Sequence, residues 1–206
     1  MSSPPPHEPL AAPADLTEQQ VDSELLFEGK FLRALRDTVR LPDGALASRE
    51  YVKHPGAVVV VALLDDGRVV LERQYRYPVG RVMIEFPAGK LDAGEDPMRC
   101  AQREMLEETG YRATQWARAG AMHLAIAYSD EVIHIYFARG LIAGAARLDD
   151  GEFLEVFSAT PAQLRAWVRS GEVTDAKTLS CMVWLDALER GDWQPQWVSG
   201  DIGDLR

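Results

Sequence analysis

Residues 89–111 read GKLDAGEDPMRCAQREMLEETGY, and this stretch decides the organisation of the chain. Asp96 is a residue type that caps the first turn of helices, and Pro97 suits the first helical position. Gly110 suits the position just beyond a helix end, where a left-handed backbone conformation is common. The stretch therefore predicts a helix over 97–109, with a glycine-containing loop before it.

Three glutamates of this predicted helix share one face. At about 100° per residue, Glu104, Glu107 and Glu108 fall within roughly 100° of arc. Ala101 and Met105 lie opposite them. We therefore expect one side of the helix to be buried and the other to carry the charge. Carboxylates this close repel one another, so the arrangement is unfavourable as scaffold unless cations neutralise it.

Oxygen-rich sites of this kind suit Mg²⁺ or Mn²⁺, which share their ligands with substrate phosphates. Zinc favours His and Cys, of which this stretch holds only Cys100. Arg103 precedes Glu107 by four residues, so we expect an ion pair that holds that carboxylate in place. The alternative is a solvated helix face with one salt bridge, the commoner origin of a charge run, but it leaves Glu95 and the glycines unexplained.

The fixed positions of the stretch resemble the Nudix box of nucleoside-diphosphate hydrolases. The matching residues are Gly89, Glu95, Arg103, Glu104, Glu107, Glu108 and Gly110, with Tyr111 where a bulky aliphatic residue is common. Short motifs often match by chance, but this many identities at fixed spacing are far more specific. The resemblance implies a loop, helix and loop that bind metal and present a diphosphate for hydrolysis. Gly89 would let the backbone approach the site closely.

The same resemblance implies roles for individual residues. Glu104 and Glu108 would be metal ligands, and the carbonyl of Ala88 would be a further ligand. Glu107 would be a ligand or a supporting catalytic carboxylate. Arg103 would belong to the catalytic set because it holds Glu107.

Outside the box, the chain resembles one branch of this family, the ADP-ribose and nucleoside-diphosphate-sugar pyrophosphatases. The matching stretches are HPGAVVVVALLDDGRVVLERQYRYPVG (54–80), EFPAGKLD at the start of the box, SDEVIHIYFARGL after it and VTDAKTL near the end. The resemblance implies a small N-terminal β subdomain that exchanges between the two chains of a homodimer. Many ADP-ribose hydrolases carry a proline-glycine pair where this chain has Ile126 and Ala127, which leaves the substrate within this branch open.

Two arginines and one loop carboxylate complete the candidate site. Arg73 and Arg76 end a predicted strand, where an arginine either lies on the surface or holds a phosphate oxygen through two hydrogen bonds. Since a regular strand alternates its faces, both cannot point into one site, and we prefer Arg76 for substrate binding. Glu131 precedes a further strand, where related enzymes place a catalytic carboxylate. It is the expected base for the attacking water, against the alternative of a solvent-facing loop carboxylate.

The remaining chain predicts an α/β (α+β) fold, which the resemblance identifies as the Nudix fold, a mixed β-sheet sandwiched between helices. Apolar, β-branched runs bounded by turn residues predict strands at 25–41, 45–53, 57–64, 69–74, 132–138 and 152–157. A hairpin turn at 42–44 joins the first two. Helices are expected at 161–170 and 175–190, the second capped by Thr174 or Asp175.

Three parts are expected along the chain. Residues 1–19 are rich in proline and predict a mobile tail. Residues 20–53 predict a small antiparallel β subdomain, which the resemblance assigns to dimerisation. Residues 54–206 then form the hydrolase domain.

Composition narrows the class of protein. The chain has 22 basic and 32 acidic residues, a formal net charge of −10, which argues against a nucleic-acid groove. It also makes a cation necessary, because bare carboxylates would repel an anionic diphosphate. No apolar run approaches the ~18 residues of a membrane span, and the first residues lack a secretory pattern. Two distant cysteines give no disulfide framework, which predicts a cytoplasmic protein.

Together these observations predict a Mg²⁺- or Mn²⁺-dependent pyrophosphatase that splits ADP-ribose or a related nucleoside-diphosphate sugar into a nucleoside monophosphate and a sugar phosphate. Neither a nucleic acid nor a membrane is expected as a partner. One alternative is a module that senses a nucleotide sugar without cleaving it, which the complete set of carboxylates disfavours. The other is a hydrolase that clears damaged nucleoside triphosphates, which the N-terminal β subdomain disfavours.

Overall fold

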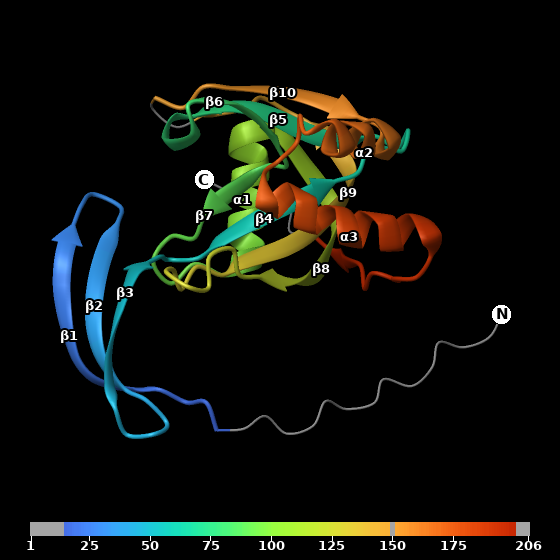
Figure 1. The fold of residues 1–206 in the computed structure, drawn as a ribbon. Helices are drawn as coiled ribbons and strands as arrows, with labels where there is room; N and C mark the ends of the chain where they lie inside the picture. The colour runs from blue at the N-terminus through green and yellow to red at the C-terminus, as the bar shows by residue number, and fades with distance from the viewer. Residues whose placement is uncertain (1–14, 149–150, 201–206) are drawn as a thin grey trace, which may run out of the picture. The chain divides into compact units, whose positions relative to one another are not determined.

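The computed structural model describes residues 15–148 and 151–200 (Figure 1). The chain divides into two units, with the boundary between Lys53 and His54, and the short segment Ala127–Ser129 belongs with the first unit. Most of the expected tail, residues 1–14, lies outside the described residues.

The first unit is an antiparallel sheet of three strands in the order β1-β2-β3. Its strands are β1 (Gln19–Glu28), β2 (Arg33–Arg40) and β3 (Leu46–Lys53). The expected hairpin turn between β2 and β3 is confirmed, with the Gly44 amide donating to the Leu41 carbonyl at 2.9 Å. The single strand expected over 25–41 is wrong. The Gly29 amide bonds to the Leu32 carbonyl at 2.8 Å, and this turn separates β1 from β2.

The second unit holds two sheets. The five-stranded sheet has the order β11-β8-β9-β4-β7, and the three-stranded sheet has the order β10-β5-β6. Strands β4 and β9 run parallel, whereas the other neighbours are antiparallel, so the larger sheet is mixed as expected. The strands are β4 (Ala57–Ala62), β5 (Val69–Arg76), β6 (Arg81–Glu85), β7 (Ala88–Lys90), β8 (Tyr111–Met122), β9 (Ile133–Ala143), β10 (Leu154–Ala159) and β11 (Val198–Ser199).

Four of these strands lie where the sequence predicts them and four do not. The predictions at 57–64, 69–74, 132–138 and 152–157 correspond to β4, β5, β9 and β10. Strands β6, β7, β8 and β11 were not predicted. The long strand β8 contains several alanines and arginines, which have little intrinsic preference for strands, and its pairing with β9 outweighs that preference.

The helices begin and end close to the predicted residues. Helix α1 (Pro97–Thr109) follows Asp96, whose side chain accepts from two backbone amides, and it ends at Gly110 in a left-handed conformation. Helix α2 spans Pro161–Ser170, and helix α3 spans Ala176–Arg190 with Asp175 as its cap. A short 3-10 helix, η1 (Tyr77–Val79), follows β5.

Strand β4 is buried along its whole length and divides the core in two. Val59 and Val61 pack in a cluster with residues of α2 and α3. Val58 and Val60 point the other way and pack with residues of α1. The helices therefore lie on both sides of the larger sheet, as expected (Figure 1). None of the helices that the structure describes combines the length and the apolar character that a membrane span requires.

Candidate active site

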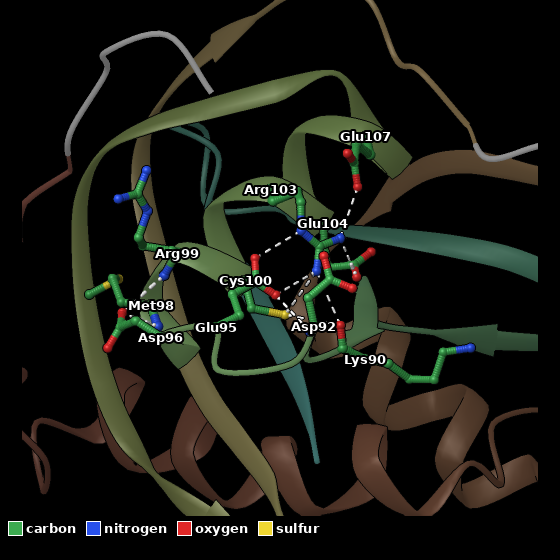
Figure 2. A network of polar contacts seen from close by, with 10 residues as sticks. All are labelled: Lys90, Asp92, Glu95, Asp96, Met98, Arg99, Cys100, Arg103, Glu104 and Glu107. Carbon is green, nitrogen blue, oxygen red and sulfur yellow. Dashed lines mark hydrogen bonds and ion pairs between the residues drawn. The ribbon is translucent and has the colours of Figure 1, made fainter. Parts of the chain in front are cut away.

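Three carboxylates surround the guanidinium of Arg103 on α1 (Figure 2). Arg103 donates two hydrogen bonds to Glu95, from Nε at 2.9 Å and from Nη2 at 2.8 Å. Its Nη1 donates to Glu104 at 2.7 Å and to Glu107 at 3.1 Å. We call Arg103, Glu95, Glu104 and Glu107 the Arg103 cluster. The expected pair between Arg103 and Glu107 is confirmed, and Glu95 is the carboxylate that Arg103 binds in a bidentate manner.

The Arg103 cluster holds Glu95 in the ionised form. Hydrogen bonds from Arg103 lower the pKa of Glu95 to about 2, and Glu95 in turn raises the pKa of Arg103. Arg103 Nη2 also donates to the Lys90 carbonyl of β7 at 3.1 Å, which ties the cluster to the sheet. One cation serves three carboxylates here, so the cluster keeps a surplus of negative charge.

Glu104 lies against the backbone of Gly89 in β7. A Cβ atom at Gly89 would stand 1.8 Å from Cδ of Glu104, so only glycine leaves room for this carboxylate. The close approach expected at Gly89 is therefore confirmed, and the group that approaches is the Glu104 side chain. Burial raises the pKa of Glu104 although Arg103 acts in the opposite direction.

Glu108 is the buried member of the glutamate face. Its exposed fraction is 3%, and its Oε2 accepts from the amide of Ala88 at 3.0 Å. The expectation that the charged side of α1 lies apart from the buried side is wrong at this residue, because α1 packs along β7. Burial, followed by the charges of Glu72 and Glu104, raises the pKa of Glu108 well above its usual range. Ala88 thus contacts the site through its amide, and its carbonyl remains a predicted ligand.

Glu72 on β5 is a buried carboxylate that the sequence analysis did not single out. Its side chain is 0% exposed, and neither oxygen has a hydrogen-bond partner among the residues that the structure describes. Burial and then the charge of Glu85, its partner in the register of β5 and β6, raise the pKa of Glu72 to about 8. The signal was present in the sequence, since VVLERQYR places a glutamate within a strand that is otherwise apolar at its start.

Two cations bind Glu85 beside Glu72. Arg76 donates from Nε at 2.8 Å and from Nη2 at 2.9 Å to the two oxygens of Glu85. Lys177 of α3 forms an ion pair with Glu85 Oε2. Burial opposes ionisation of Glu85, but these partners outweigh it and lower its pKa. We call Glu85, Glu72, Arg76 and Lys177 the Glu85 cluster.

Glu152 links the two clusters and was also missed. Gln74 of β5 donates to its Oε1 at 3.2 Å. Its charge raises the pKa of Glu72, Glu104 and Glu108, so its carboxylate lies within electrostatic reach of all three. The sequence analysis treated Glu152 as the first residue of a strand. Strand β10 begins two residues later, which leaves Glu152 in the preceding loop.

Arg73 and Arg76 lie on opposite faces of β5, as the alternation argument predicts. Arg73 pairs with Glu155 at 3.0 Å and its guanidinium lies 4.0 Å from the centre of the Phe157 ring. Arg76 lies on the face that carries Glu72, and its pKa responds to the charge of Glu108 after that of Glu85. Of the two arginines, Arg76 is thus the one beside the carboxylates.

Glu131 lies beside a histidine in the loop before β9. Its Oε1 is 3.4 Å from Nε2 of His54, and the amide of His54 donates to Asp130 at 2.9 Å. Glu131 is not among the charges with the largest effect on the pKa of Glu104 or Glu108. Its expected role as the base therefore remains a prediction, with Glu152 as a competitor.

The donor set suits a divalent cation. Among residues 15–148 and 151–200, no three His, Cys, Asp or Glu side chains form a metal cage ready-made. The groups that share the site are nevertheless carboxylates, which favour Mg²⁺ or Mn²⁺ over zinc. Glu108 is buried, and the oxygens of Glu72 lack a hydrogen-bond partner among the described residues, so a bound cation would stabilise the ionised form of such carboxylates. The residues present therefore fit such an ion.

Comparisons with known proteins show which chains resemble this one. An ADP-ribose pyrophosphatase from Bacillus subtilis (strain 168) is 39% identical over 176 residues, which cover 84% of this chain and 95% of that protein. A methanol dehydrogenase activator from Bacillus methanolicus is 36% identical over 84% of this chain and 94% of its own length. A crystal structure of an ADP compounds hydrolase matches with a TM-score of 0.77 over 88% of this chain and 98% of that chain. At 18% identity, that match concerns the fold.

Family models cover both units of the chain. Residues 18–52 match the nucleoside diphosphate sugar hydrolase N-terminal domain. Residues 53–179 match the NUDIX domain, and they include every residue of the two clusters. The chain therefore belongs to the Nudix hydrolase family.

Proposed function

We propose that this protein hydrolyses the diphosphate bond of ADP-ribose or a related nucleoside-diphosphate sugar, with Mg²⁺ or Mn²⁺ as cofactor. The observation that carries the proposal is the site itself, in which Glu108 is buried within electrostatic reach of Glu104 and Glu152, and Arg76 lies within reach of Glu108. The matching N-terminal domain and the similarity to a Bacillus subtilis ADP-ribose pyrophosphatase support the substrate class.

Nudix hydrolases generally need a divalent metal. Glu104, Glu108 and the Ala88 carbonyl would hold it here, and the bound ion would neutralise phosphate charge and act as a Lewis acid. Arg103 keeps Glu104 and Glu107 in place through its hydrogen bonds. The negative surplus of the Arg103 cluster is the reason why the substrate diphosphate requires the cation at this site.

Arg76 is the residue that binds the diphosphate directly. Its Nε and Nη2 are used by Glu85, and no group in the described part of the chain accepts a hydrogen bond from Nη1. The side chain is 40% exposed, so Nη1 is open to a phosphate oxygen. Arg76→Ala should lower kcat/KM by about 10²-fold, as the loss of one charged donor typically does. Arg73→Ala, on the other face of β5, is the matched control and should leave kcat/KM nearly unchanged.

Glu152 is the preferred base in this proposal. It takes a proton from the water whose oxygen attacks phosphorus, while the phosphoanhydride bond breaks and the second phosphate group leaves. The effect of its charge on the pKa of Glu104 and Glu108 supports this role, whereas Glu131 pairs with His54. Glu131 remains the second candidate.

We also propose a cytoplasmic homodimer that acts on small molecules and uses neither nucleic acid nor membrane. The first unit exposes large apolar side chains, which typically mark a protein interface. They include Val21, Leu25, Leu26, Phe27, Phe31 and Leu32. Light scattering after size exclusion should give twice the chain mass, and Phe27→Asp should shift the protein toward monomer. Both free cysteines are buried, which accords with a reducing compartment.

A panel of ADP-ribose, GDP-mannose, UDP-glucose and NADH, assayed with Mg²⁺ and scored by products, tests the activity. The proposal expects a nucleoside monophosphate and a second phosphate product from at least one of them, and no product after chelation. Saturable binding without product under varied metals and pH would instead identify a nucleotide-sugar sensor. Nucleoside triphosphates hydrolysed much faster than the panel would identify a triphosphate hydrolase.

A further inference from the structure

We propose that Lys177 is a positioning residue which, through Glu85, fixes the Arg76 guanidinium in the orientation that binds the substrate diphosphate. Lys177 lies in VTDAKTL, a stretch whose contribution to the site the function above does not explain. The inference rests on the proposed function, since it assigns Arg76 to the substrate.

The first step is the geometry between Arg76 and Glu85. Two parallel hydrogen bonds, at 2.8 and 2.9 Å, join the guanidinium to both carboxylate oxygens. This two-pronged arrangement sets the plane of the guanidinium as well as its place. Any rotation of the Glu85 carboxylate therefore turns Arg76 and the direction in which Nη1 points.

The second step is that Lys177 restrains the Glu85 carboxylate. Its ammonium forms an ion pair with Oε2, one of the two oxygens that Arg76 uses. A second carboxylate, Asp175, also binds the ammonium, with its Oδ2 3.1 Å from Nζ of Lys177. Asp175 caps α3 by accepting from the amide of Thr178 at 2.9 Å. The orientation of Arg76 is thus traced through Glu85 and Lys177 to the rigid start of a helix.

The backbone next to Glu85 is tied to the same helix start. The amide of Phe86 donates to Oγ1 of Thr178 at 3.2 Å, and that hydroxyl donates to Asp175 at 2.7 Å. Both the side chain of Glu85 and the backbone that follows it are therefore bound to residues at the start of α3. A change at Lys177 removes only the side-chain restraint, which makes it a selective test.

The third step is the charge opposite Glu85. Glu72 is its cross-strand partner, and both carboxylates are at most 1% exposed. Glu72 has no hydrogen-bond partner among the described residues, and burial and the charge of Glu85 raise its pKa to about 8, so it stays protonated at neutral pH. Glu85 is therefore the ionised carboxylate of the pair, and Arg76 and Lys177 both bind it. Without Lys177, a buried ionised carboxylate would keep Arg76 alone of these two cations, and less would oppose its reorientation.

The experiment is a double-mutant cycle on the full-length protein with Mg²⁺ and the panel substrate that wild type hydrolyses fastest. Lys177→Met should lower kcat/KM by about 10- to 100-fold, the usual cost of losing a supporting contact or misplacing a group by about 1 Å. Arg76→Ala should cost as much or more. If Lys177 acts through Arg76, the double variant should be no worse than Arg76→Ala, because the same interaction is lost only once.

Matched variants separate positioning from loss of stability. Arg165→Met removes an ion pair between α2 and Asp186 of α3, at 2.8 Å, and should lower the melting temperature without changing kcat/KM. Lys177→Gln keeps a hydrogen-bond donor, serves if Lys177→Met does not fold, and should give a smaller loss. Additive costs in the cycle, or a Lys177 variant that folds with wild-type kcat/KM, would overturn the inference.

A spectroscopic readout tests the same point without turnover. The ¹⁵N–¹H signal of Arg76 Nε, assigned by its loss in Arg76→Lys, should exchange slowly with solvent in wild type because Glu85 accepts from it. Lys177→Met should shift this signal and speed its exchange, and an unchanged signal would overturn the inference alone. Absence of any panel product from wild type would instead overturn the proposed function. The two failures are therefore distinct.

Discussion

The Arg103 cluster and the Glu85 cluster lie in one site but combine cations and carboxylates in opposite ways. In the first, a single arginine holds three carboxylates that come from one short stretch of chain and are partly open to solvent. In the second, an arginine and a lysine from distant elements bind one buried carboxylate, Glu85, while its buried neighbour Glu72 has no hydrogen-bond partner among the described residues. The first cluster keeps a negative surplus that suits a cation, whereas the second neutralises Glu85 and holds Arg76 in place. Local spacing builds the side proposed to bind metal, and tertiary packing builds the side proposed to bind the diphosphate.

The substitution expected to have the largest effect, and so to test this comparison most strongly, is Glu108→Gln. Glu108 is buried beside both clusters, and a neutral amide of the same shape can still accept from the Ala88 amide. We expect turnover to fall by about 10³-fold or more, equivalent to several kcal/mol of lost metal-dependent stabilisation. The protein should remain folded, with circular dichroism and melting temperature as the check.

The control for Glu108 is Glu155→Gln, an exposed carboxylate on β10 whose side chain is 67% exposed. It should keep wild-type turnover. Hydrolysis at the wild-type rate by Glu108→Gln would contradict the assignment of the metal side to this glutamate. Calorimetry with Mn²⁺ adds a measurement that does not depend on activity, and the variant should bind the ion more weakly.

The next largest effect separates Glu152 from Glu131. A positioned general base typically contributes about 10²- to 10⁴-fold, so Glu152→Gln should lower kcat by at least about 10²-fold. Glu131→Gln should have a much smaller effect, because it loses only its contact with His54. The rise of kcat with pH on the acidic side of the profile should be lost only in the variant that lacks the base. The reverse pattern would restore Glu131 to the role.

A smaller and more selective change is Gly89→Ala. The added methyl group would meet Glu104 at 1.8 Å from Cδ, and the flexible end of that side chain can move away. We expect little change in melting temperature but a fall in kcat/KM of about 10²-fold, because displacing a reacting group by about 1 Å costs that much. Gly94→Ala, in the loop after β7, meets nothing within 4 Å but lies at φ +76°, so it tests backbone strain without a collision. An equal fall in kcat/KM in both variants would mean that the contact with Glu104 is not the cause of the loss.

The contrast between the clusters also explains what the sequence could predict. Arg103, Glu104, Glu107 and Glu108 lie within two turns of one helix, so helical geometry alone brings them together, and their spacing carries a family signature. Glu72 and Glu85 meet only through the register of β5 and β6, and the strand β6 was not predicted.

Lys177 and Glu152 were also not predicted as residues of the site, and both lie farther along the chain. Each reaches the site through elements that are distant in sequence, α3 and the loop before β10. No periodicity links these residues to the box, because their proximity follows from how strands and helices pack. Strand β8 was missed for a related reason, since its pairing with β9 overrides its composition. Local chemistry was predictable, and the contacts between distant segments were not.

The smallest expected effects concern how folding stability changes with pH, and the sign of this change should differ between the two clusters. Burial and Glu85 raise the pKa of Glu72 to about 8 from its ordinary 4.5, so the folded state keeps a proton that the unfolded state has lost. Stability from this group is therefore full below pH 4.5 and falls as pH rises toward 8. Glu72→Gln removes the dependence, and the metal-free variant should melt higher than wild type by about 5 °C or more at pH 9, given about 2–4 °C per kcal/mol.

Glu95→Gln should behave in the opposite way. Arg103 lowers the pKa of Glu95 to about 2, so the ionised pair contributes stability above pH 4.5 and loses it as pH falls toward 2. The variant should melt below wild type at neutral pH, and the difference should shrink with acidification. Thermal melts of both variants and wild type from pH 2 to pH 9 measure the two slopes. Only a buried carboxylate without a partner, such as Glu72, lowers the stability of the protein when it ionises at high pH. Slopes of the same sign for Glu72 and Glu95 would therefore mean that the two clusters do not differ in how their charges are compensated.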